Sequence, residues 1–335
     1  MIAAIDGYQR RHGWLGFPLG VVYKFFDDQG GYLAALITYY AFLSIFPLLL
    51  LASSILGFVL QGNPELRADI LESAVAQFPV IGSELTTTQG LTGSTVAIVI
   101  GLLGALYGAL GIAQATQHAM NVAWSVPRNR RPNPLFSRLR SLLLLAIAGL
   151  SVLSITLLSL LAAELGWLGA GESVWSRMLV TVLTVAISAV VFSLLFWLAT
   201  TDDHDIRDVV PGAVIAALLL HGMQLVGAAY VGTVVRNTSL TYGVFAVVLG
   251  LLAWIYVSAI LMVMCIELNV VVERQLYPRA LLTPFTDDVD LTDADRRAYT
   301  AYANAQRTKG FETVHVSFDA GKRRRGHIGK HSHGH

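Results

Sequence analysis

The chain has 335 residues, of which 55% are hydrophobic and 13% are charged, and its formal net charge is +1. Soluble globular proteins carry about a quarter charged residues, so this composition excludes an ordinary soluble protein and indicates an α-helical membrane protein. The nearly neutral charge excludes a global field that would attract nucleic acid, and no nucleic-acid partner is expected.

The first residues are polar and are broken by Gly13, Gly16 and Pro18, without the short apolar core and small-residue cleavage site of a cleavable signal peptide. Within them, residues 14–28 have the composition of a short amphipathic helix with five aromatic side chains. We expect this helix to lie at the membrane interface. Residues 1–30 are therefore interpreted as a cytoplasmic N-terminal segment that contains an interfacial helix.

Six windows contain no Asp, Glu, Lys or Arg, at residues 29–64, 85–127, 141–163, 178–201, 209–235 and 237–266. Each is at least as long as the about 20 apolar residues that cross a bilayer core. A lipid-facing backbone must satisfy its own hydrogen bonds, and a run this apolar does so as a helix. The sequence predicts an all-α, polytopic membrane domain of about six spans over residues 31–276. The predicted spans are 31–60, 94–124, 141–165, 174–200, 211–235 and 242–272.

Three local features are predicted within this domain. Pro47 is expected to kink span one, because proline removes a helical hydrogen bond. Pro211 is expected in the first turn of span five, where proline is well tolerated. Apolar residues recur at helical spacing over residues 65–78, which predicts an amphipathic helix on the outer side of the membrane.

The tail, residues 277–335, is polar and charged, and we expect it to be cytoplasmic and partly disordered. One short helix, capped by Thr292, is predicted within it. If both termini lie inside, the inner segments hold 20 of the 23 Lys and Arg residues, as the positive-inside rule favours. The basic run Lys322–Arg325 is expected to contact anionic lipid headgroups.

Four stretches resemble the YihY/BrkB family of bacterial inner-membrane proteins, in order and spacing, over about residues 14–276. Span one reads GGYLAALITYYAFLSIFPLLLL from Gly30, and span two ends in NVAW before a basic loop. Span five opens with PGA, and span six reads LTYGVFAVVLGLLAWIYVSAILMVMCIELN. The chain departs from the family pattern at Cys265 and Ile266, where a Gly-Ala pair usually precedes the glutamate.

The resemblance implies a six-span inner-membrane protein tied to envelope integrity or serum resistance, without a settled biochemical activity. Some members have carried the name ribonuclease BN. A metal-dependent nuclease of that kind needs a cluster of His and Asp that binds two metal ions, and this sequence has no such cluster. It also has no phosphate-binding loop, nucleophile elbow or HExxH motif, so we expect no enzyme.

Polar residues inside the apolar windows are costly to bury in lipid, and they are the candidates for a cavity that binds a ligand. The candidates are Tyr40, Ser44 and Pro47 in span one, Gln114, His118 and Asn121 in span two, His221 and Gln224 in span five, and Glu267 and Asn269 at the end of span six. Their structural alternatives are interhelical hydrogen bonds, packing, and helix-end contacts with water. Glu267 could bind a proton or a cation, or it could pair with a basic residue.

A stripe of glycines follows one side of span two, which allows another helix to approach closely. It consists of Gly101, Gly104, Gly108 and Gly111. No metal site is expected, because the acidic residues of segment 202–208 are adjacent rather than spaced around one cation. Residues 288–295 lack the Gly and Glu of a calcium loop. No cofactor is expected either.

Two functions from different classes fit these patterns. The first is a transporter-like or lipid-handling protein, in which a polar intramembrane cavity between spans one, two, five and six holds an amphiphile. Membrane lipids and that amphiphile are then its partners. The alternative is a structural or scaffold protein of the envelope, which acts through partner proteins that bind the outer segment or the tail. The glycine stripe could also serve a homo-oligomer.

Overall fold

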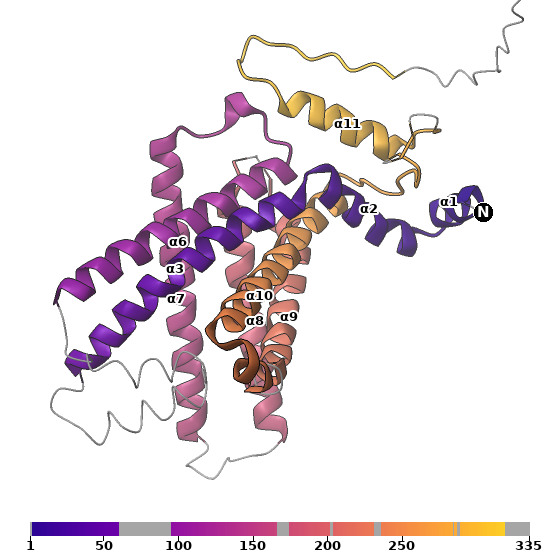
Figure 1. Cartoon of the computed structure of the whole chain (residues 1–335). Coiled ribbons are helices and arrows are strands. Elements are labelled where there is room, and N and C mark those ends of the chain that lie inside the picture. The colour runs from indigo at the N-terminus through magenta and orange to yellow at the C-terminus, as the bar shows by residue number, and fades with distance from the viewer. Residues whose placement is uncertain are drawn as a thin grey trace, which may run out of the picture.

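In the computed structural model, every regular element of the described residues is a helix (Figure 1). The structure describes residues 2–59, 95–165, 174–201, 204–230, 236–283, 285–286 and 289–318. The elements are α1 (Ile2–Arg11), α2 (Gly13–Asp27), α3 (Gly30–Val59), α6 (Thr95–Ala123), the 3₁₀ helix η1 (Arg128–Arg130), α7 (Pro134–Leu165), α8 (Val174–Ala199), α9 (Ile206–Tyr230), α10 (Arg236–Glu273) and α11 (Asp293–Ala305). Six of these, α3 and α6 to α10, are long and apolar enough to cross a membrane. The predicted all-α fold with six spans is confirmed.

Large apolar side chains cover the outer surfaces of the six long helices. Leu103 of α6 and Leu153 of α7 are 63% and 66% exposed, and Val182 of α8 is 61% exposed. In water such surfaces would cost roughly 25 cal/mol for each Å² of apolar area. Lipid chains solvate them without that cost, so the chain is an integral membrane protein.

Helix α7 begins several residues before the charge-free window of span three. The side chain of Asn133 accepts a hydrogen bond from the backbone N–H of Phe136 at 2.9 Å, and Pro134 occupies the first helical position. Asparagine at the cap and proline directly after it are both favoured at a helix start. The local capping signals therefore set this boundary, and the charged residues Arg138 and Arg140 lie inside the helix.

Helix α9 also begins early, at Ile206, so Pro211 lies inside the helix rather than in its first turn. The carboxylate of Asp208 accepts a hydrogen bond from the backbone N–H of Asp205 at 2.8 Å, which satisfies a donor at the helix start. A charge-free window cannot show a helix start of this kind, because the residues that cap the helix are themselves charged.

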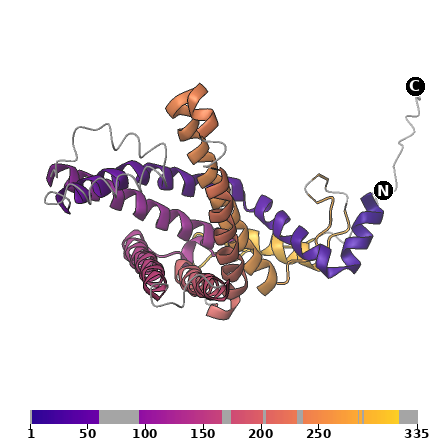
Figure 2. The ribbon, with the colours of Figure 1, turned by 90° about the horizontal axis from the view of Figure 1, so that it is seen from below.

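Helices α3 and α6 run side by side and are steeply inclined to α7 (Figures 1 and 2). The glycine stripe of α6 faces α3, with Gly111 at Tyr40, Gly108 at Ser44, and Gly104 and Gly101 at Pro47. A Cβ atom on Gly108 would lie 2.8 Å from the Cα atom of Ser44, which is closer than real Cβ contacts. The missing side chains therefore allow the two helices to touch. Helix α3 continues through Pro47 to Val59.

The buried core gathers at one end of the bundle, where α2, η1 and α11 also lie and which we call the charged end (Figure 1). Its buried residues come from the starts of α3 and α9 and from the last turns of α6, α8 and α10. Examples are Ala34, Ala119, Phe196, Val209 and Val263. The tightest packing, and with it the best-defined polar contacts, is therefore at the charged end.

The short helix predicted in the tail is confirmed as α11. The hydroxyl of Thr292 accepts a hydrogen bond from the N–H of Asp295 at 3.1 Å, and the Asp295 carboxylate accepts one from the N–H of Thr292 at 2.9 Å. The helix predicted over residues 14–28 is confirmed as α2. The predicted outer helix over residues 65–78 and the basic run Lys322–Arg325 lie outside the described residues.

Candidate functional site

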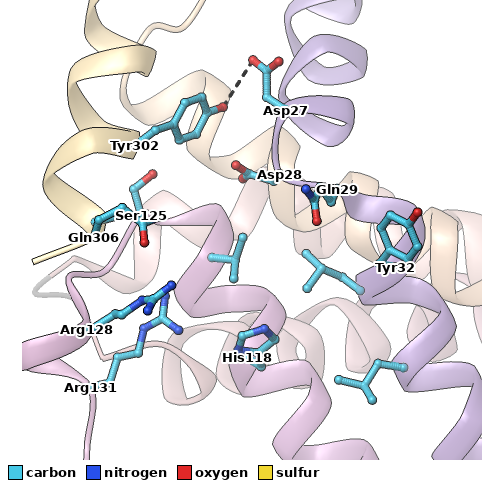
Figure 3. A pocket seen from close by; sticks show the side chains of 14 residues that line it. Asp27, Asp28, Gln29, Tyr32, His118, Ser125, Arg128, Arg131, Tyr302 and Gln306 are labelled. Carbon is cyan, nitrogen blue, oxygen red and sulfur yellow. Dashed lines mark hydrogen bonds between the residues drawn. The ribbon is translucent and has the colours of Figure 1, made fainter. Parts of the chain in front are cut away.

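A cavity of about 670 Å³ lies at the charged end, between the connection of α2 to α3, the end of α6 and the last turn of α11 (Figure 3). We call it the groove. It is lined by Asp27, Asp28, Gln29, Tyr32, Leu33, Leu36, His118, Val122, Ser125, Arg128, Arg131, Tyr302, Ala305 and Gln306. Its acidic side chains come from the α2–α3 connection and its basic ones from α6 and the η1 segment, so opposite walls carry opposite charges.

The acidic wall is formed by a sharp connection between two helices. The N–H of Asp28 donates to the carbonyl of Lys24 at 3.0 Å and closes α2, and Gln29 then takes a φ of 55°. Gly30 begins α3 at a place where any Cβ atom would overlap the ring of Phe25. These two unusual positions allow the chain to turn within two residues, and the turn places Asp28 at the junction of the groove and the core.

The basic wall follows the end of α6. Ser125 takes a φ of 51° and ends the helix, after which the chain brings Arg128 and Arg131 beside His118 (Figure 3). The Nε atom of Arg131 donates to the carbonyl of Val126 at 3.3 Å. Burial, and then the charge of Arg128, lower the pKa of Arg131. Two adjacent guanidinium groups repel each other, so an anion between them would be strongly favoured.

A buried ion cluster lies directly behind the acidic wall. The ammonium of Lys24 forms an ion pair with Asp28, lies 3.3 Å from Oε2 of Glu267, and donates to the carbonyl of Ala123 at 2.9 Å. Burial alone would lower the pKa of Lys24, but the carboxylates of Glu267 and Asp28 raise it above its ordinary value. Burial raises the pKa of Asp28. The cluster thus joins α2, α6 and α10.

A second cluster fastens the tail to α2. The guanidinium of Arg279 lies 2.9 Å from Oδ2 of Asp27 and 2.5 Å from Oδ1 of Asp295. The hydroxyl of Tyr302 donates to Asp27 at 3.5 Å (Figure 3). Burial opposes the charge of Arg279, but the two carboxylates raise its pKa above the ordinary value, and burial raises that of Tyr302. Arg279 therefore stays charged and Tyr302 neutral at physiological pH.

The predicted cavity residues are spread over several places. His118 lines the groove, and Glu267 lies behind its acidic wall. Gln114 and Gln224 are exposed on α6 and α9, and His221 is half-buried on α9. Tyr40, Ser44 and Pro47 lie against the glycine stripe.

The two remaining candidates, Asn121 and Asn269, form hydrogen bonds between elements. Oδ1 of Asn121 accepts from the hydroxyl of Thr201 at 3.0 Å, which ties α6 to the end of α8. Oδ1 of Asn269 accepts from the N–H of Gly212 at 2.6 Å, inside the contact between α10 and α9. Both asparagines are buried. In the structure they act as interhelical ties at the charged end.

Sequence reasoning did not find the groove's charged residues. Lys24 had a detectable signal, because it shares a helix face with Gly20 and Val21 and stands four residues before Asp28. A lysine on an apolar face with an acid one turn later indicates a buried pair. No comparable sequence pattern distinguishes Arg131 and its neighbours, since they belong to a basic loop between two spans.

The groove offers charged donors and an apolar wall rather than a metal centre. Among the described residues, no group of three or more His, Cys, Asp or Glu side chains is placed to hold a metal ion. Arginine and histidine side chains can bind an anion by hydrogen bonds and charge. Leu33, Leu36 and Val122 form the apolar part of the lining.

The family model described as Virulence factor BrkB matches residues 21–287. The ribonuclease-like protein YfkH of Bacillus subtilis is 26% identical over 257 residues, which cover 74% of this chain and 91% of that protein. Inner membrane protein YhjD of Escherichia coli is 24% identical over 263 residues, or 72% of this chain and 76% of YhjD. A UPF0761 membrane protein of Azotobacter vinelandii is 28% identical over 254 residues, which cover 73% of this chain and 60% of that protein. No solved structure matches the chain.

Proposed function

The chain belongs to the Virulence factor BrkB family, and from that premise we propose that it is a transporter-like, lipid-handling membrane protein that binds an anionic amphiphile in the groove. The observation that carries the proposal is that the basic wall of Arg128, Arg131 and His118 lines the same groove as apolar residues of α3. Planar guanidinium groups bind phosphate and carboxylate groups through paired hydrogen bonds. The volume of the groove, about 670 Å³, falls within the range of small-molecule sites.

The apolar side of the groove continues onto the lipid-facing surface of α3. Leu33 is buried in the groove, whereas Tyr32 is 77% exposed and Leu36 is 38% exposed. A headgroup held by the arginines would therefore have its acyl chains next to the exposed face of the helix. This arrangement suits a molecule with an anionic head and an apolar tail better than a small water-soluble anion.

The proposal places the protein in the bacterial inner membrane, with the charged end and both termini in the cytoplasm. The relative YhjD is named an inner membrane protein. The segment between α6 and α7 contains Arg128, Arg130 and Arg131, and short basic segments of this kind favour the cytoplasmic side. Lipids of the cytoplasmic leaflet are partly anionic, so the groove would open where such headgroups are found.

The word ribonuclease belongs to the name of the relative YfkH. The residues that line the groove do not support nuclease chemistry in this chain. The proposed activity is binding and movement of an amphiphile without a chemical change. The proposed binding site is therefore the groove at the charged end, which shares His118 with the polar cavity expected between spans one, two, five and six. His221 and Gln224 stay predicted cavity residues.

The test compares wild type with the Arg128→Ala/Arg131→Ala double variant in binding to vesicles and in lipid retention by native mass spectrometry. Vesicles of phosphatidylglycerol and of phosphatidylcholine provide the anionic and neutral headgroups. We expect wild type to retain phosphatidylglycerol selectively and the variant to retain it at least tenfold less. Arg138→Ala, which removes an exposed arginine outside the groove, is the matched control.

Two outcomes would contradict the proposal. Equal lipid profiles of wild type and the double variant would favour a scaffold role that depends on partner proteins. Competition by inorganic phosphate as effective as that by phosphatidylglycerol vesicles would show that the groove takes a free anion instead of an amphiphile.

A further inference from the structure

The cluster behind the acidic wall holds more carboxylates than cations. The ammonium of Lys24 is 1% exposed and contacts both Asp28, 3% exposed, and Glu267, 0% exposed. One positive charge thus faces two carboxyl groups that are almost completely buried. A buried negative charge that is not neutralised is strongly unfavourable, so the cluster needs one more positive charge.

The neighbouring cations do not supply that charge. Arg279 is engaged by the buried Asp295 and by Asp27, which is 24% exposed and therefore reaches solvent. The ring of Tyr302 lies over the Lys24 ammonium at 5.3 Å, and its hydroxyl is directed to Asp27. The contact from α6 is the Ala123 carbonyl, which is an acceptor and brings no positive charge.

The other charged groups near the cluster are on its outer side. His118 of α6 lines the groove, and Arg274, one turn beyond the end of the buried part of α10, lies over the ring of Trp124 at 5.6 Å. Both carboxyl oxygens of Glu267 are fully buried, and neither accepts a hydrogen bond from any described residue. An oxygen in that position is the natural place for a bound proton, because a protonated carboxyl needs fewer donors than a carboxylate.

We infer that Asp28 and Glu267 form a proton-binding site in which the two carboxyl groups share a single proton beside the Lys24 ammonium. With that proton the buried cluster is neutral. Two carboxyl groups that contact the same ammonium interact strongly, so the proton belongs to the pair rather than to either residue. Asp28 also lines the groove, which gives the proton a path to water.

The site links α10 to the turn between α2 and α3, which forms the acidic wall of the groove. Asp28 closes α2 at the sharp turn into α3, and Glu267 belongs to α10. Loss of the shared proton would leave a net negative charge between α10 and the turn from α2 to α3. That charge would lie next to the acidic wall of the groove. The proton-binding site does not depend on what the groove binds.

Infrared spectroscopy of the purified protein tests the inference, because a protonated carboxyl absorbs at a higher frequency than a carboxylate and shifts in heavy water. A maltoside detergent avoids ester carbonyl bands, and the measurement is made at neutral pH. We expect wild type to show the band of one protonated carboxyl. The band should be absent from Glu267→Gln and also from Asp28→Asn, because in each variant Lys24 neutralises the one carboxylate that remains.

Two further variants sharpen the experiment. Glu273→Gln changes an exposed glutamate on the same helix and should keep the band. Lys24→Met removes the ammonium, so both carboxyl groups must be protonated and the band should double. Should Glu267→Gln fail to fold, Asp28→Asn and Lys24→Met still decide the question.

Three results would overturn the inference. Absence of the band from wild type would mean that both carboxylates are ionised. Persistence of the band in Asp28→Asn would mean that burial alone protonates Glu267. An unchanged band in Lys24→Met would mean that the lysine does not hold either carboxyl in its ionised form. The ester bands of any bound lipid do not shift in heavy water, whereas the band of a protonated carboxyl does, so failure of the proposed function would leave the measurement unaffected.

Discussion

The Nε atom of Arg279 lies 2.5 Å from Oδ1 of Asp295, and both side chains are almost completely buried. The other oxygen of Asp295 accepts hydrogen bonds from the N–H groups of Thr292 and Ala280, at 2.9 and 3.1 Å. One carboxylate therefore caps α11 and fastens it to the segment that follows α10. Because Arg279 also pairs with Asp27, this contact joins the tail to α2.

Replacement of Asp295 by alanine should release α11 from the charged end. The substitution removes one of the two carboxylates that pair with Arg279. It also removes the carboxylate that accepts the hydrogen bond from the N–H of Thr292 at the start of α11. Breaking a buried ion pair costs about 3–5 kcal/mol, and losing a cap costs about 1 kcal/mol. Hydrogen exchange measured by mass spectrometry should show α11 peptides exchanging at least tenfold faster than in wild type.

The control for this prediction is Asp293→Ala, which removes an exposed acid from the same first turn of α11. Its exchange should stay close to that of wild type. If Asp295→Ala also exchanges like wild type, α11 is held by other contacts, and the role assigned to the Arg279–Asp295 pair is wrong.

Thr292 and Asp295 also show what the sequence can and cannot predict. The cap at Thr292 is a local signal, carried by residues three apart, and it was predicted correctly. The pairing of Asp295 with Arg279 was not predicted, because it depends on how the tail folds back onto α2. The six spans and the family membership were predicted correctly for the same reason as the cap: length, apolarity and short motifs are visible along the chain.

The candidate site was harder to predict, because its residues come from distant elements. Asp28, Arg131 and Tyr302 meet in the groove only after three helices have packed together. The polar residues inside the predicted spans include His118 and Glu267. Charged residues outside those spans are not predicted as site residues, since charge near a membrane surface is ordinarily solvated.

Gly212 should tolerate no side chain, because α9 and α10 touch at this residue. A Cβ atom there would overlap the carbonyl oxygen of Cys265 and lie 2.6 Å from both terminal atoms of Asn269. Gly212→Ala should therefore disturb the hydrogen bond from its N–H to Asn269. We expect a destabilisation of about 1–3 kcal/mol, which is typical of overpacking, measured as a lower thermal unfolding temperature in detergent.

Gly222→Ala is the matched control, since it lies on the same helix and an added Cβ would meet nothing within 4 Å. Alanine is favoured over glycine inside a helix by up to about 1 kcal/mol, so this variant should be neutral or slightly more stable. Equal effects of the two substitutions would show that backbone propensity, and not the contact with α10, governs Gly212.

Docking of α1 should depend on pH through Asp6. Its carboxylate accepts a hydrogen bond from the N–H of Leu281 at 3.0 Å and pairs with Arg10 at 2.7 Å. Partial burial alone would raise the pKa of Asp6, but the bonds from Leu281, Gln9 and Arg10 lower it below its ordinary value of 3.8. The docked state thus binds fewer protons than the undocked state near that pH. Its extra stability is present above pH 3.8 and is lost as the pH falls through the lowered pKa.

Hydrogen exchange of the peptide that contains Leu281, corrected for the intrinsic pH dependence of exchange, measures this docking. In wild type the protection should be constant from neutral pH down to about pH 4 and should fall at lower pH. Asp6→Asn keeps an oxygen acceptor but cannot ionise, so its protection should be weaker at neutral pH and should change less on acidification. An identical pH profile in both proteins would show that another group controls the contact between α1 and the segment after α10.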